Sequence, residues 1–157
     1  MFDRLLPVRI DNSYRGHKLA LWLFALVVLV KTSIALGTIF NGRNAATTAD
    51  NIPLDTFTPA GAQAFLSVFA IWGLAQATIG LVCILALVRY RAMVPFMFVL
   101  LLLEHLTRKL ILFVMPIAKT GSPPGFFINL ALVALMIVGS ILSLRNQVGS
   151  QAPQSLS

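Results

Sequence analysis

The chain has 157 residues, of which 58% are hydrophobic and only 11% are charged. A chain this short forms at most one domain, and a soluble domain of that size could not bury so much apolar surface. The composition therefore excludes an ordinary water-soluble fold. It predicts an all-α, polytopic membrane protein whose first partner is the lipid bilayer.

The formal net charge is +7, which at first resembles the charge of a nucleic-acid-binding module. Such modules gather Lys and Arg on one polar face, whereas here these residues stand mostly at the ends of apolar runs, where they fix orientation in a membrane. We therefore predict no nucleic-acid partner. The single cysteine, Cys83, lies in an apolar run and excludes both an intrachain disulfide and a redox thiol pair.

The first predicted membrane span covers residues 19–40 and follows an N-terminal tail of residues 1–18. Residues 11–13 (Asp-Asn-Ser) are candidate caps for its start, and Lys18 marks its cytoplasmic edge. The apolar run is longer than the core of a cleaved signal peptide, which favours a permanent span.

Residues 41–58 are polar and rich in turn formers, and we expect them to form a surface loop. Thr58 followed by Pro59 is typical of a helix start, with a hydroxyl cap and then proline in the first turn. The second predicted span, residues 60–88, is longer than a bilayer requires, so we expect it to tilt or to begin in the interface.

The third and fourth predicted spans cover residues 93–117 and 125–144. Ser122 and the two prolines after it repeat the pattern of a cap followed by proline, and predict the start of the fourth span. Residues 146–157 are polar and predict a disordered tail. The expected architecture is a four-helix transmembrane bundle over residues 19–145.

The distribution of Lys and Arg predicts the orientation. Two basic residues, Arg43 and Lys119, lie on one predicted face of the membrane. The opposite face carries seven: Arg4, Arg9, Arg15, Lys18, Arg89, Arg91 and Arg145. The positive-inside rule then places both termini in the cytoplasm. The compact loops favour a bacterial inner membrane.

Five ionisable residues lie inside the predicted spans: Lys31, Glu104, His105, Arg108 and Lys109. A loop at residues 104–109 would leave backbone groups unpaired in hydrocarbon, so one helix must carry the last four. Glu104 and Arg108 are one turn apart and can form an ion pair, and His105 and Lys109 repeat that spacing on an adjoining strip. Because a central Arg or Lys costs roughly 2.5 to 3.5 kcal/mol in lipid, we expect this surface to face the bundle interior.

Depth along the helices predicts which residues meet. Lys31, Gln76 and Glu104 each lie 13 residues from a basic residue at the cytoplasmic edge. At about 1.5 Å per residue, all three lie roughly 20 Å into the membrane. We predict that they meet in the bundle interior. A strip of small residues on the second span favours close helix packing there: Ala70, Gly73, Ala77 and Gly80.

The candidate binding residues are therefore Lys31, Gln76, Glu104, His105, Arg108 and Lys109. Three cations against one carboxylate leave an excess of two positive charges inside the bilayer, which favours an anionic lipid, an anionic solute or an acidic residue on a partner helix. We therefore expect a binding or accessory membrane protein. Two alternatives stay open: charged side chains that only hold helices in register, with Arg108 and Lys109 extending to the outer surface, and an oligomeric proton-coupled carrier that uses Glu104 and His105.

The sequence contains no catalytic, metal-binding or phosphate-binding motif, and we expect neither an enzyme nor a cofactor. Haem ligation by two histidines is excluded because His17 and His105 lie at membrane depths about 20 Å apart. A neighbouring Glu104 and His105 point roughly 100° apart on a helix, so they do not form an acid–base dyad.

Overall fold

The computed structural model describes residues 11–14 and 16–145, and every regular element in these ranges is helical. The predicted C-terminal tail at 146–157 lies outside the described residues. So does most of the predicted N-terminal tail, including three basic residues that contribute to the predicted orientation, Arg4, Arg9 and Arg15.

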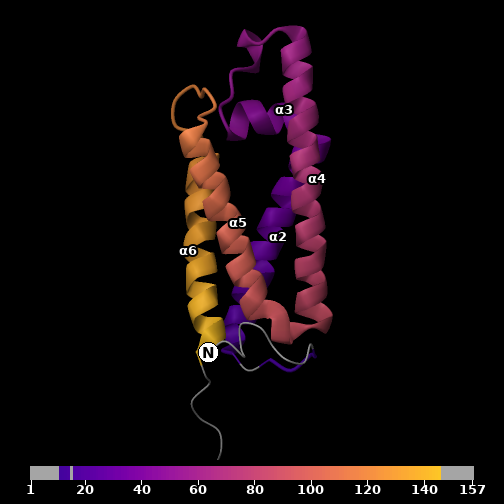
Figure 1. Cartoon of the computed structure of the whole chain (residues 1–157), viewed down its shortest axis with the longest axis vertical. Coiled ribbons are helices and arrows are strands. Elements are labelled where there is room, and N and C mark those ends of the chain that lie inside the picture. The colour runs from indigo at the N-terminus through magenta and orange to yellow at the C-terminus, as the bar shows by residue number, and fades with distance from the viewer. Residues whose placement is uncertain (1–10, 15, 146–157) are drawn as a thin grey trace, which may run out of the picture.

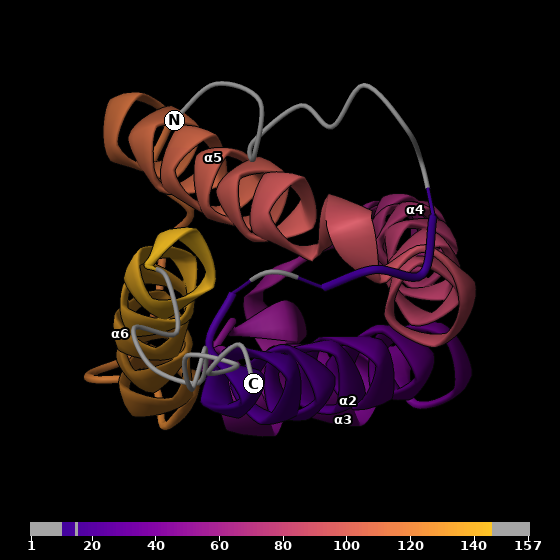
Figure 2. The same cartoon turned by 90° about the horizontal axis from the view of Figure 1, so that it is seen from below.

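Four long helices lie side by side: α2 (Lys18–Phe40), α4 (Pro59–Arg89), α5 (Val94–Val114) and α6 (Gly125–Leu144) (Figure 1). Viewed along the bundle, α2 lies between α4 and α6, and α5 lies across from α2 (Figure 2). Helices α2, α4 and α6 are long and apolar enough to cross a membrane, as in a membrane-embedded protein. Because α5 contains three charged residues, length and composition support three spans where the sequence predicted four.

The helix bounds follow the predicted spans closely, except at the end of α5. This helix ends at Val114, three residues before the predicted end, and Met115 is its C-cap. Pro116 comes next and has no N–H with which to continue the helical hydrogen bonds. A short 3₁₀ turn, η3 (Arg91–Met93), joins α4 to α5.

Residues 41–58 fold into helical turns, so the prediction of a plain surface loop is wrong in this part. They form α3 (Gly42–Asn44), the π-helical turn η1 (Ala45–Ala49) and the 3₁₀ turn η2 (Leu54–Thr56). Three apolar side chains explain the order, because Ala46, Ile52 and Leu54 are buried against phenylalanines of α4. In Figure 1, α3 lies across the end of the bundle opposite the N label.

The helix starts confirm one predicted cap and correct two. The Thr58 hydroxyl accepts a hydrogen bond from the Gly61 N–H at 3.1 Å, as the sequence predicted. The cap of α2 is His17, whose Nδ1 accepts from the Leu19 N–H at 3.1 Å, and not a residue of 11–13. Helix α6 starts from Pro124 without a side-chain cap, so the predicted role of Ser122 is wrong.

The apolar core fills the part of the bundle nearer to the N label. Phe24 of α2 and Phe98 of α5 are fully buried and meet edge to face, with ring centroids 4.9 Å apart. The Phe98 ring lies directly on Gly139 of α6, where a Cβ atom would overlap it. On the other side, Gly73 and Gly80 of α4 face α2 at close range, as the small-residue strip predicted. Close packing of α2 with both α4 and α6 fixes the frame of the site.

Candidate functional site

Lys31, Gln76 and Glu104 form one hydrogen-bonded group, which confirms the contact predicted from helix depth. The Lys31 ammonium donates to Glu104 Oε2 at 2.8 Å, and the Gln76 amide nitrogen donates to Glu104 Oε1 at 3.0 Å. The Lys31 and Glu104 side chains are only 10% and 20% exposed. Glu104 therefore joins α5 to both α2 and α4 in the bundle interior.

The sequence predicted an ion pair between Arg108 and Glu104, but the closer contacts of Arg108 are with His105 and Trp72. Its Nε lies 3.8 Å from Glu104 Oε1, which is an ion pair but too long for a hydrogen bond. Its Nη2 lies 3.1 Å from His105 Nδ1, and its guanidinium carbon stands 5.1 Å from the centroid of the Trp72 ring. The guanidinium is therefore held between an imidazole on its own helix and an aromatic face on α4.

The contact with Arg108 fixes the tautomer of His105. A guanidinium can only donate, so Nδ1 must accept and carries no proton. The single ring proton of His105 is then on Nε2. This nitrogen is buried and has no hydrogen-bond partner in the part of the chain that the structure describes, and the whole residue is 0% exposed. A buried donor without an acceptor costs about 1 to 3 kcal/mol.

Lys109 does not join this group. Its side chain is exposed, and its ammonium lies 5.8 Å from the centroid of the Phe126 ring on α6. His105 and Lys109 therefore do not share an interior strip, and the prediction that all four ionisable residues of α5 face one interior surface is wrong. Helix rotation does not separate the two residues, which lie one turn apart on the same side of α5. Lys109 is one turn nearer to the end of α5, where its ammonium reaches Phe126 at the start of α6.

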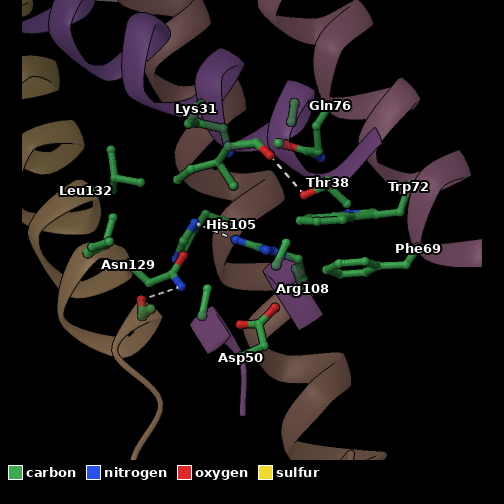
Figure 3. Close-up of a pocket in the computed structure, with 17 residues that line it drawn as sticks. Lys31, Thr38, Asp50, Phe69, Trp72, Gln76, His105, Arg108, Asn129 and Leu132 are labelled. Atoms are coloured by element: carbon green, nitrogen blue, oxygen red, sulfur yellow. Dashed lines mark hydrogen bonds between the residues drawn. The ribbon is translucent and has the colours of Figure 1, made fainter. Parts of the chain in front are cut away.

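A cavity of about 210 Å³ opens beside these residues, between the four long helices and η1. Figure 3 shows Lys31 and Asp50 at opposite ends of it, with His105 and Arg108 between them. Of the predicted site residues, Lys31, Gln76, His105 and Arg108 line the cavity, and Glu104 is bonded to two of them. The remaining walls come from Ile34, Ala35, Gly37, Thr38, Ala45, Ala49, Asp50, Phe69, Trp72, Gly125, Ile128, Asn129 and Leu132.

Asp50 is a charged cavity residue that the sequence analysis missed. It follows η1, in the segment that was expected to be a surface loop, and its carboxylate lines the cavity (Figure 3). With Asp50 added to Glu104 and Lys109 outside the cavity, two cations stand against two carboxylates here, and not three against one. The only sequence signal was the Asp50-Asn51 pair, which marks a turn but not the direction in which the chain folds back.

Trp72 and Asn129 also belong to the site. Trp72 stacks on Phe69 with centroids 5.6 Å apart, so its ring is held in place beside Arg108. The Asn129 amide nitrogen donates to the Gly125 carbonyl, one turn earlier on α6, at 2.7 Å. This hydrogen bond leaves the Asn129 side-chain oxygen as an acceptor beside the cavity.

Comparison with protein-family models, with curated proteins and with solved structures gives no match to this chain.

Proposed function

We propose that this is a four-span integral membrane binding protein, in which Lys31, His105 and Arg108 hold the anionic group of a small ligand inside the helix bundle. The observation that carries the proposal is the buried Nε2–H of His105, which has no acceptor among the described residues and belongs to a residue that lines the cavity. Ionisable groups at this depth in a membrane typically mark binding sites or pathways.

The donors at this point match an oxyanion. Arg108 Nε is also buried and has no hydrogen-bond partner within residues 11–14 and 16–145. The Lys31 ammonium uses one of its three protons on Glu104. An anionic group placed in the cavity offers more than one oxygen to these donors. Because Arg108 stands at Nδ1 of His105 and the Nε2–H points to the other side of the ring, the two residues need different oxygens of the ligand. Hydrogen bonds to an ionised acceptor are about twice as strong as neutral ones, so such a ligand offsets the cost of the unpaired donors.

The path of α5 supports a fourth span. It runs beside α6 between the two ends of the bundle (Figure 1), and its 21 residues reach about 30 Å, the thickness of the hydrocarbon layer. Its Glu104 and His105 side chains are turned inward, so its apolar residues can meet lipid. Four spans return both termini to one side, and the excess of basic residues there supports a cytoplasmic location, in a bacterial inner membrane.

The size of the cavity favours a small ligand over a partner helix. A helix with its side chains is about 10 Å wide and does not fit a space of about 210 Å³. A free organic anion or the head of an anionic lipid carries the required oxygen atoms. Because the site lies inside each bundle, the outer surface of the protein stays open for a homo-oligomer or a partner subunit.

Thermal unfolding of the purified protein in detergent tests this proposal. Acetate, 3-methylbutanoate, phosphate and an anionic lipid are added separately to the wild type and to two variants, Arg108→Met and His105→Phe. A ligand that binds only the folded state raises the melting temperature of the protein, and the rise grows with the ligand concentration. We expect at least one anion to stabilise the wild type and neither variant.

Lys109→Met is the matched control, because it removes a neighbouring cation that does not line the cavity. It should keep the full response to the anion. If no anion stabilises the wild type, or if Lys109→Met abolishes the response as Arg108→Met does, the proposed site is wrong.

A carrier is the second candidate, because the cavity lies beside the Lys31–Glu104 pair at about the depth where carriers place their substrate sites. In that case Glu104 and His105 would exchange protons while an oligomer moved the ligand. Liposomes that contain the protein and a pH-sensitive dye distinguish the two functions. Proton flux that depends on the ligand indicates a carrier, and binding without flux indicates a binding protein.

A further inference from the structure

Asp50 and Arg108 line the same cavity with opposite charges and do not pair with each other. Both side chains are visible in Figure 3, with the Asp50 carboxylate beyond Arg108 as seen from Lys31. Among the described residues, the ion pairs within 4.0 Å are Lys31–Glu104 and Arg108–Glu104, and neither includes Asp50. The Asp50 carboxylate thus stands outside these two ion pairs, across the cavity from Lys31, where it can meet a positively charged group of a ligand.

The backbone holds Asp50 in this place. Its N–H donates to the Ala45 carbonyl at 3.2 Å and closes the π-helical turn η1. The next residue, Asn51, has a φ of 52°, a left-handed conformation that asparagine adopts more readily than most residues. Its amide nitrogen donates to the Thr120 carbonyl at 3.0 Å, and its own carbonyl accepts from the Thr120 N–H at 2.9 Å. The turn that carries Asp50 is thus fixed to the loop between α5 and α6.

We propose that the ligand is a small zwitterion, a free amino acid whose carboxylate meets His105 and Arg108 and whose ammonium group meets Asp50. This inference rests on the proposed anion-binding function and specifies its ligand. The Asn129 side-chain oxygen is a second acceptor for the ammonium group, because the amide nitrogen is already bonded to Gly125.

The charge count at the cavity supports a zwitterion over a simple anion. Lys31 and Arg108 contribute two positive charges, and Glu104 and Asp50 contribute two negative ones. A zwitterion leaves this sum at zero. A monoanion adds one net charge to a poorly hydrated interior, where an unbalanced charge is costly.

The walls and the volume limit the rest of the ligand. Apolar side chains of Ile34, Phe69, Ile128 and Leu132 line the space between the polar groups. A cavity of about 150 Å³ accommodates benzene, so at roughly 25 Å³ per heavy atom this one accommodates about eight. That is the size of valine, and the apolar walls fit its side chain.

The experiment compares valine with the two molecules that lack one of its charges. These are 3-methylbutanoate, without the amine, and 2-methylpropylamine, without the carboxylate. Trp72 lines the cavity, and the other tryptophan, Trp22, is 76% exposed. In a Trp22→Phe background, the fluorescence of Trp72 therefore reports binding directly.

We expect valine to bind at least about tenfold more tightly than 3-methylbutanoate, because its ammonium group adds a charge-assisted hydrogen bond to Asp50 that 3-methylbutanoate cannot make. The amine alone should bind most weakly. In Asp50→Asn the preference for valine over 3-methylbutanoate should disappear. Asp55→Asn is the matched control, because Asp55 is an exposed acid of η2 outside the cavity, and it should keep the preference.

The outcomes separate this inference from the proposed function. If 3-methylbutanoate binds as tightly as valine in the wild-type cavity, or if Asp50→Asn keeps the preference, the ligand is a simple anion. The anion site then stands and the zwitterion is excluded. If neither valine nor the anions of the thermal-unfolding panel bind, both proposals fail.

Discussion

The Lys31 ammonium on α2 donates a 2.8 Å hydrogen bond to the Glu104 carboxylate on α5, 73 residues further along the chain. The two helices have few other contacts at this level, since α2 packs mainly on α4 and α6. The pair, with Gln76 on the other carboxylate oxygen, therefore positions the helix that carries His105 and Arg108.

Removing one member of this pair should destabilise the bundle more than removing both. Lys31→Met leaves a buried carboxylate without its cation, and Glu104→Gln leaves a buried ammonium without its anion. Each single change should cost roughly 3 to 5 kcal/mol, as for other broken buried pairs. The double variant should recover part of that loss. A double-mutant cycle in thermal or denaturant unfolding measures the coupling, and purely additive losses would show that the two charges act independently.

Gly139→Ala should weaken the packing of α5 on α6. A Cβ atom at this position overlaps the Phe98 ring, which is itself fully buried against Phe24. Overpacking of this kind costs about 1 to 3 kcal/mol. Gly37→Ala is the control, because a Cβ atom there meets nothing within 4 Å, and it should leave stability unchanged or raise it by up to about 1 kcal/mol. Equal melting temperatures for the two variants would contradict the packing described for Phe98.

Cysteine labelling tests the fourth span and the orientation together. In a Cys83→Ala background, Arg91→Cys reports on the connection between α4 and α5, and Lys119→Cys reports on the connection between α5 and α6. Both positions are exposed. A membrane-impermeant maleimide added to intact cells should label position 119 only, and position 91 should react after the membrane is opened. Labelling of both positions in intact cells would mean that α5 does not cross.

The buried phenol of Tyr14, which precedes α2, should make the protein less stable at high pH. Burial raises the pKa of its phenol to about 12, above the ordinary value of about 10. The unfolded chain loses this proton first, so the contribution of Tyr14 is complete below pH 10 and is lost as the pH rises through about 12. Between pH 10 and about 12, the free energy of unfolding should therefore fall less steeply with pH in Tyr14→Phe than in the wild type. An unchanged slope would show that the phenol titrates alike in both states.

Tyr14→Phe should also leave stability at neutral pH unchanged or increase it. The phenol oxygen is buried and has no hydrogen-bond partner among the described residues. Removing an unpaired polar atom removes its desolvation cost, about 1 to 3 kcal/mol at most. The melting temperature at pH 7 is the measurement. A clear drop would mean that the hydroxyl has a partner in the folded protein.

The sequence by itself determined the long helices and the level at which polar groups meet. Apolar runs of bilayer length and the Thr58-Pro59 start predicted α4 almost to the residue. A constant rise per residue predicted that Lys31, Gln76 and Glu104 lie at one depth, and the three side chains are in contact. These features depend only on local geometry, which repeats along the chain.

Only the tertiary structure decided which side chains face the cavity. The surface of α5 that faces inward is set by contacts between helices, such as Phe98 on Gly139. Spacing within α5 could not tell that His105 is buried while Lys109, one turn further along, is exposed beside Phe126. The return of Asp50 to the cavity depends on apolar side chains of its own segment packing on α4, and on Asn51 bonding to Thr120. Such contacts join residues distant in sequence and leave no periodic pattern, because each one depends on where the partner helix or loop already lies.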